Sequence, residues 1–141
     1  MDYLIDTNVL SEWRKGARAN SCLVAWMNHV PQMHLFLSVL VIGEVRCGIE
    51  GIRPRDATQA AALEVWLARI SQTFEGRILP VTQQIAETWG RLSTPDPLSE
   101  VDGLLAATAI AHDLTLVTRN TRDVARTGVR LLNPFESQPD R

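Results

Sequence analysis

The chain has 141 residues, a length typical of one domain, so we expect a single domain spanning residues 1–141. Hydrophobic residues make up 45% and charged residues 21%, which is ordinary for a folded globular protein and argues against disorder. Fourteen Lys and Arg against sixteen Asp and Glu give a net charge of −2. This balance excludes a generally basic coat for nucleic acid, although a local basic surface remains open.

The cysteines and the start of the chain bear on its compartment. Cys22 and Cys47 show neither CxxC nor Cys/His spacing, so we expect two buried, reduced thiols rather than a disulfide framework or a zinc site. Asp2 stands where a signal peptide carries basic residues, and the most apolar stretch, 35–42, is too short to cross a bilayer. We therefore expect a cytoplasmic protein with no membrane partner.

Short apolar runs alternate with longer helical patterns along the chain. The pattern predicts strands over residues 3–5, 34–37, 78–81, 114–118 and 129–132. It predicts helices over 21–30, 39–52, 56–74, 82–92 and 98–113, with a short helical turn around 121–126. The helix over 98–113 is apolar nearly all round, so we expect it to be central and buried. This alternation predicts an α/β fold with a central parallel sheet, in which ligands bind beyond the carboxyl ends of the strands.

Polar side chains interrupt apolar surroundings at four places. Asp6 ends the first predicted strand, and Asp102 begins the most apolar helix. Glu44 lies within an apolar helical run, where burying a free carboxylate is costly. Asn120 follows the strand over 114–118, with Asp123 three residues later.

Taken singly, each of these residues also has a purely structural explanation. Asp6 suits a helix cap, Asp102 suits the end of a capping box, and Glu44 suits pairing with an arginine. Asn120 and Asp123 are common turn residues.

Together, the acidic residues indicate chemistry at one edge of the sheet. In a parallel sheet Asp6 and Asn120 lie at the same edge, and Asp102 starts the helix that leads into the second of those strands. Carboxylates gathered there repel one another, and no lysine or histidine nearby in the sequence neutralises them. A hard cation such as Mg²⁺ or Mn²⁺ compensates this charge, and carboxylate-held Mg²⁺ usually handles phosphates. The residues therefore predict metal-assisted phosphoryl chemistry.

Four segments resemble the PIN-domain ribonucleases, and within them the VapC-type toxins of bacterial toxin–antitoxin pairs. They are Leu4-Ile5-Asp6-Thr7-Asn8-Val9-Leu10, the helix around Glu44, Asp102-Gly103-Leu104-Leu105-Ala106-Ala107-Thr108-Ala109, and Leu116-Val117-Thr118-Arg119-Asn120. Their order and spacing match over essentially the whole chain. The resemblance implies a PIN-like fold and hydrolysis of RNA phosphodiester bonds at an acidic pocket that binds Mg²⁺ or Mn²⁺.

The resemblance also assigns residues and partners. Asp6 and Asp102 become the principal metal ligands, and Glu44 completes the catalytic pocket. The family's fourth acidic position falls on Asn120, an amide of lower charge, and Asp123 is the alternative. Thr7 and Thr118 are expected to orient a metal ligand or a water molecule without binding the ion themselves. The family usually forms homodimers and binds a small VapB-type antitoxin whose tail fills the pocket.

Basic and aromatic residues give a weaker signal. Arg119 and Arg122 lie beside the expected site and are candidates for RNA phosphate contacts, because the arginine fork suits phosphate. For most other arginines a solvated surface is the simpler interpretation. The four tryptophans have helical spacing, which favours packing over base stacking. They are Trp13, Trp26, Trp66 and Trp89.

Other functions compete with this interpretation. A phosphoacceptor receiver domain needs a lysine near the end of a late strand, but Lys15, the only lysine, comes far too early. A haloacid-dehalogenase-like phosphatase needs a second aspartate where this chain has Asn8. The more serious alternative is a PIN-like binding module whose pocket is weakened catalytically by Asn120.

Overall fold

Five short parallel strands form the centre of this computed structural model, which describes residues 1–139. They are β1 (Tyr3–Ile5), β2 (Leu35–Ser38), β3 (Ile78–Leu79), β4 (Thr115–Val117) and β5 (Leu131–Leu132). The spatial order is β3-β2-β1-β4-β5, and every neighbouring pair is parallel. The predicted α/β class with a central parallel sheet is confirmed, and β1 lies at its middle.

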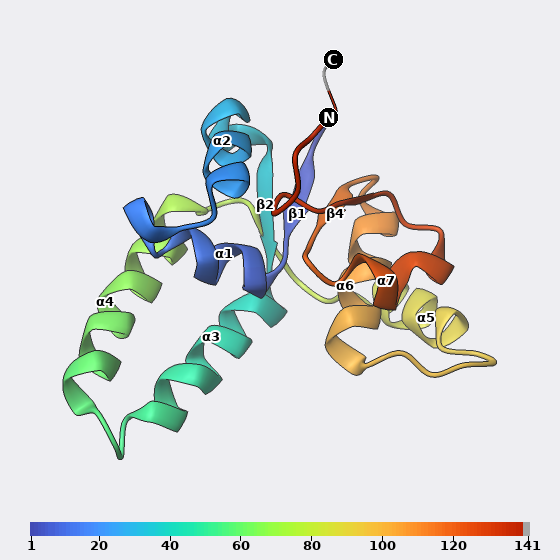
Figure 1. The fold of residues 1–141 in the computed structure, drawn as a ribbon. Helices are drawn as coiled ribbons and strands as arrows, with labels where there is room; N and C mark the ends of the chain where they lie inside the picture. The colour runs from blue at the N-terminus through green and yellow to red at the C-terminus, as the bar shows by residue number, and fades with distance from the viewer. Residues whose placement is uncertain (140–141) are drawn as a thin grey trace.

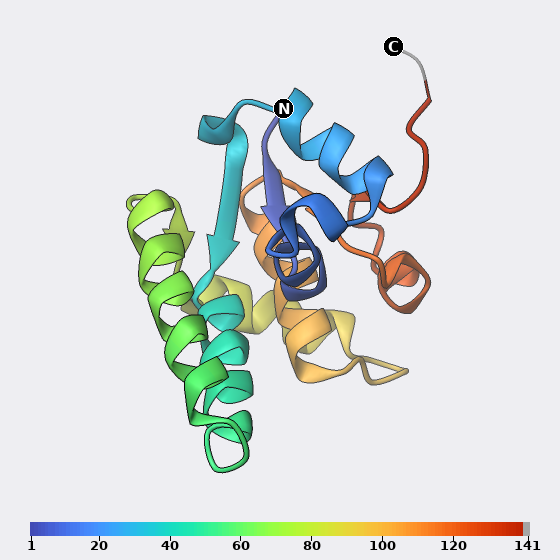
Figure 2. The same ribbon diagram turned by 60° about the vertical axis from the view of Figure 1, so that its left-hand side comes forward.

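Helices cover both faces of the sheet. On one side lie α1 (Thr7–Trp13), α2 (Ser21–His29), α3 (Val39–Ile52) and α4 (Ala57–Thr73), as Figure 1 shows. On the other lie α5 (Gln83–Leu92), α6 (Glu100–Ala111) and α7 (Thr121–Val124). The α3–α4 pair projects beyond the sheet (Figure 2). Short 3₁₀ turns cover Gly16–Arg18, Gln32–His34 and Ala125–Thr127, and the first two were not predicted.

Polar caps explain why most helices start close to the predicted residues. The side chain of Ser38 accepts from the backbone N–H of Leu40, and α3 then runs over the full predicted range 39–52. Thr82 caps α5 in the same way. The predicted strand over 78–81 is shorter in the structure because Pro80 has no N–H to donate to a ladder. The predicted strand over 129–132 is reduced to two residues.

The core surrounds β1, whose three residues are all buried. The middle of α6 is buried against the sheet, which confirms its predicted central position. The prediction of two buried thiols is wrong, since Cys22 is partly exposed and Cys47 is exposed, although both are free. Cys47 lies on the outward side of α3, where helical spacing rather than hydrophobicity decides its exposure. Within residues 1–139, no helix is long and apolar enough to span a membrane.

Candidate active site

Asp6 lies at the carboxyl end of the central strand and caps α1. Its backbone N–H donates to the carbonyl of Val117 at 3.0 Å, which joins the ends of β1 and β4. One carboxylate oxygen accepts from the Thr7 N–H at 2.7 Å, and the other accepts from the Thr118 hydroxyl at 2.8 Å. Asp6 therefore caps a helix and also lies at the edge of the sheet where the site was expected.

Burial makes the charged form of Asp6 unfavourable. The residue is only 6% exposed, and this desolvation is the main cause that raises the pKa of its carboxyl group. Hydrogen bonds from Thr118 and Thr7 oppose the rise, while the charges of Asp102 and Glu44 add to it. The structure thus brings Asp102 and Glu44 close enough to Asp6 for their charges to raise the pKa of its carboxyl group.

Glu44 reaches the site from α3 through a contact with α1. The Thr7 hydroxyl donates to its carboxylate at 2.6 Å, across 37 residues of sequence. The concern about burying this carboxylate is removed, because Glu44 is exposed on the helix surface and the apolar residues around it face the core. Glu44 also has no arginine partner in the described part of the chain, so ion pairing does not explain its presence.

Asp102 lies in the first turn of α6 and is partly exposed. The side chain of Ser99 accepts from its N–H at 3.3 Å and caps the helix, which begins at Glu100, two residues later than predicted. The next residue, Gly103, lets α5 approach closely, because a Cβ added there would lie 2.6 Å from the Trp89 ring. This tight packing fixes the turn of helix that carries Asp102. Trp89 therefore has a packing role, as predicted.

Asn8 is a site residue that the sequence analysis did not select. Its amide donates to Asp6 at 3.4 Å and to the Thr118 hydroxyl at 3.3 Å, and its oxygen accepts from the Arg119 N–H at 3.2 Å. These contacts join α1 to the segment that follows β4. Its position two residues after Asp6 in the Asp-Thr-Asn run is the signal that would have identified it.

The two candidates for the fourth position lie in different settings. The Asn120 N–H donates to the Thr118 hydroxyl at 3.0 Å, but its exposed side chain makes no capping bond to α7. Asp123 lines a small cavity together with Asp102. Thr118 is almost completely buried and connects Asp6, Asn8 and Asn120.

Asp6, Glu44 and Asp102 together form what we call the acidic cluster. It has no basic partner among residues 1–139, where every ion pair involves other residues. In that same range, no three Asp, Glu, His or Cys side chains are already gathered tightly enough to hold a metal ion by themselves. Asp6, Asp102 and Glu44 still form an uncompensated oxygen-donor set, which suits Mg²⁺ because this ion usually keeps several water ligands. The residues present therefore fit a divalent cation that is partly hydrated.

Arg119 and Arg122 flank this edge, and both are exposed. The Arg119 guanidinium lies 3.8 Å above the centre of the Phe135 ring, which stabilises its position. Arg130, further along, pairs with Asp113.

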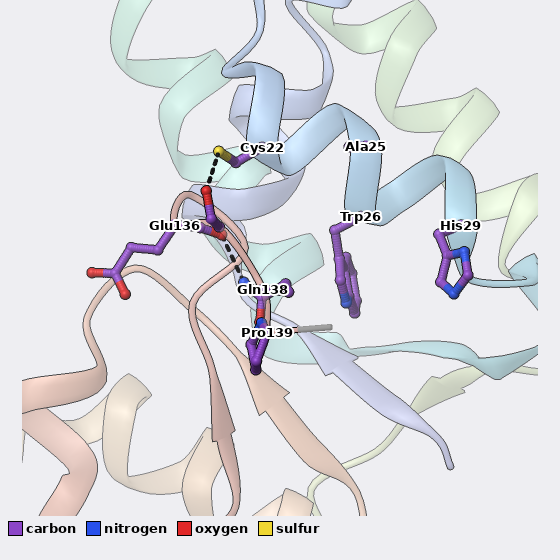
Figure 3. A pocket seen from close by; sticks show the side chains of 8 residues that line it. Cys22, Ala25, Trp26, His29, Glu136, Gln138 and Pro139 are labelled. Atoms are coloured by element: carbon purple, nitrogen blue, oxygen red, sulfur yellow. Dashed lines mark hydrogen bonds between the residues drawn. The ribbon is translucent and has the colours of Figure 1, made fainter. Parts of the chain in front are cut away.

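A cavity of about 480 Å³ lies elsewhere, between α2 and residues 136–139. Figure 3 shows Cys22, Trp26 and His29 along α2, with the Glu136 carboxylate pointing away from Trp26. It contains none of the predicted site residues.

A parallel sheet with helices on both faces defines an α/β fold, and Asp6 lies at the carboxyl end of its central strand. The PIN domain model matches residues 3–129, and the chain belongs to the PIN domain family. It is 29% identical to Toxin FitB of Neisseria gonorrhoeae, with 94% of this chain and 97% of FitB covered. It is 32% identical to Ribonuclease VapC19 of Mycobacterium tuberculosis, over 84% and 89% of the two chains. The solved structure of FitAB bound to an IR36 DNA fragment superimposes with a TM-score of 0.87 at 27% identity, covering 99% of each chain.

Proposed function

We propose that this protein is a metal-dependent endoribonuclease and the toxin of a toxin–antitoxin pair. The observation that carries the proposal is that Glu44 and Asp102, from two other elements, lie near enough to raise the pKa of Asp6, and that none of the three has a basic partner within residues 1–139. Membership of the PIN domain family and the likeness to a ribonuclease and a toxin support it. The alternative of a weakened binding module depends on Asn120, which leaves these three carboxylates intact.

Asp6 and Asp102 would hold the ion, and Glu44 would hold a second ion or position the attacking water. When bound, Mg²⁺ or Mn²⁺ supplies a Lewis acid that polarises the phosphate and lowers the pKa of water. Burial and the neighbouring acids already penalise the charge on Asp6, so a cation offsets an unfavourable interaction in the protein.

The surrounding hydroxyl groups orient the carboxylates. Thr118 fixes one oxygen of Asp6, and Thr7 fixes one oxygen of Glu44. Each threonine therefore holds one carboxylate in a single direction, which suits a ligand set that must keep its geometry during the reaction. Asn120 and Asp123 are the two candidates for the fourth position.

Arg119 and Arg122 would attract the RNA backbone toward an otherwise acidic pocket. Both side chains are exposed, and the ring of Phe135 supports Arg119 without neutralising it. A bound phosphate would then find a planar donor beside the metal site.

By the same proposal, a VapB-type antitoxin blocks the acidic pocket, the toxin forms a homodimer, and the protein acts in the cytoplasm as a single domain. The likeness to Toxin FitB and to the FitAB structure supports the proposal that this chain is a toxin with a protein partner.

Two measurements test the proposal. RNA cleavage by the purified chain with Mn²⁺ is compared with cleavage by Asp6→Asn, and the melting temperature is measured with and without Mn²⁺. We expect cleavage that depends on Mn²⁺, and stabilisation by Mn²⁺ that is lost in Asp6→Asn. Equal cleavage by both proteins contradicts the assignment of Asp6. Absence of both cleavage and stabilisation in the wild type favours the binding module.

A further inference from the structure

A second cavity, of about 280 Å³, adjoins the acidic cluster and shares Asp102 with it. It is lined by Pro97, Leu98, Ser99, Asp102, Asp123 and Arg126. We propose that this cavity takes one unpaired base of the RNA beside the scissile phosphate, and that Asp123 selects bases that carry an amino group. This inference rests on the proposed function, because it names the part of the substrate that the same site recognises.

Arg126 builds the wall of the cavity. From the segment after α7, its guanidinium donates to the carbonyl of Leu92 at 3.1 Å and also to the carbonyl of Asp96. These two acceptors lie at the end of α5 and within the loop that follows it. One side chain therefore holds the loop over 93–99 against α7 and keeps the cavity in shape.

The cavity lies directly beside the acidic cluster, and a hydrogen bond joins the two. Ser99 lines the cavity and also accepts from the N–H of Asp102, which influences the charge on Asp6. A group bound between Leu98 and Asp123 thus lies beside a proposed metal ligand. In a single-stranded RNA, the group next to a reacting phosphate is the neighbouring nucleotide.

The charges of the lining favour a base over a second phosphate. Asp102 and Asp123 are acidic, and the one basic lining residue, Arg126, uses two of its donors on backbone carbonyls. A phosphate would face two carboxylates. A base is uncharged, its flat face suits the apolar side chains of Pro97 and Leu98, and protein recognition of RNA commonly uses unstacked single-stranded bases.

The free carboxylate of Asp123 supplies selectivity. Asp123 forms no ion pair within residues 1–139, so it can accept a hydrogen bond from a ligand. Carboxylates accept from the N4 amino group of cytosine. Uracil has a carbonyl oxygen at the equivalent position, which a carboxylate repels. Cytosine and uracil therefore form a matched pair that differs in the group that Asp123 reads.

The test measures binding, so it does not depend on turnover. Fluorescence anisotropy gives the affinity of Asp6→Asn for labelled hexacytidylate and hexauridylate, and then the affinity of the double variant with Asp123→Asn. We expect hexacytidylate to bind about tenfold more tightly, the scale of one hydrogen bond to a charged group. The second substitution should bring the ratio close to one, because an amide can donate to uracil as well as accept from cytosine.

Asp96→Asn in the same background is the control, because it removes one negative charge from the adjacent loop and does not line the cavity. It should keep the tenfold ratio. Equal affinities before the second substitution, or an unchanged ratio after it, overturn the inference. Loss of Mn²⁺ stabilisation in the single variant Asp123→Asn also overturns it, by assigning Asp123 to the ion. Failure of the proposed function would be recognised separately, by the absence of RNA cleavage in the wild type.

Discussion

Two carboxylates of helix α3, Glu44 and Glu50, have opposite surroundings. Near the far end of α3, Glu50 and Glu64 of α4 share two arginines, Arg46 and Arg53. Near the sheet, Glu44 accepts a hydrogen bond from Thr7 but has no basic partner in the part of the chain that the structure describes. The charges of Glu50 and Glu64 are compensated by the two arginines. The charge of Glu44 is not compensated in this way, so a cation from outside the chain can bind there.

Helical spacing explains the difference. Glu50 has Arg46 four residues before it and Arg53 three residues after it, positions that share a helix face. At the corresponding positions around Glu44 the chain has Leu40, Val41, Cys47 and Gly48. The residues that hold the α3–α4 pair together are thus kept separate from those that form the site.

The protonation equilibria follow these surroundings. Hydrogen bonds from Arg53 and then Arg46 lower the pKa of Glu50 to about 2, and the same arginines lower the pKa of Glu64. Burial, Asp102 and Glu44 raise the pKa of Asp6. A carboxylate whose charge the folded protein disfavours is a better candidate for function than one whose charge it stabilises.

The largest expected effect is on catalysis. Asp102→Asn should lower the rate of RNA cleavage by about 100-fold or more. Removing one electrostatic contact to the reacting groups of an enzyme typically has an effect of this size. Glu50→Gln makes the same chemical change in the paired group and should leave cleavage unchanged. The measurement is the cleavage rate with Mn²⁺, with circular dichroism to check folding. A similar loss in both variants would remove the distinction between the two groups.

The next effect concerns the packing that positions Asp102. Gly103→Ala places a methyl group 2.6 Å from a carbon of the rigid Trp89 ring, so α5 and α6 must separate. We expect the free energy of unfolding to fall by about 1–2 kcal/mol, since overpacking outweighs the gain in helix propensity. Chemical denaturation measures it.

The control is the same substitution in a Trp89→Leu background. There the clash is absent, so Gly103→Ala should stabilise the protein slightly through helix propensity. Destabilisation of equal size in both backgrounds would show that the Trp89 contact does not set the position of α6.

The sequence predicted the elements better than it predicted the contacts of the site. Helix α3 matches the expected range because Ser38 and the apolar spacing are local signals. The strands were predicted too long at 78–81 and 129–132, since pairing partners distant in sequence decide where a ladder ends. The Gly103–Trp89 contact was missed for the same reason, because Trp89 lies on another helix, whereas Asn8 had a local signal in the Asp-Thr-Asn run. Nothing local to Glu44 showed that Thr7 would bind it.

A smaller effect should appear in the pH dependence of stability. Because the folded protein raises the pKa of Asp6, its charge destabilises the fold as pH rises through that folded-state value, and this penalty is absent below the ordinary value of 3.8. Asp6→Asn keeps a hydrogen-bonding side chain without the charge. At neutral pH in EDTA we expect it to raise the melting temperature by roughly 2–4 °C, the shift that about 1 kcal/mol produces at this size.

The smallest effect has the opposite sign and sharpens the comparison. The charge of Glu50 stabilises the fold above the unfolded pKa of 4.5, and this contribution is lost as pH falls toward about 2. Because the pair is exposed and screened, Glu50→Gln should lower the melting temperature by at most about 2 °C at neutral pH, and less in high salt. Melting curves from pH 2 to 7 should therefore diverge from the wild type upward for Asp6→Asn and downward for Glu50→Gln. Divergence in the same direction would mean that the two carboxylates are equally well compensated, and the case for an external cation would lose its electrostatic basis.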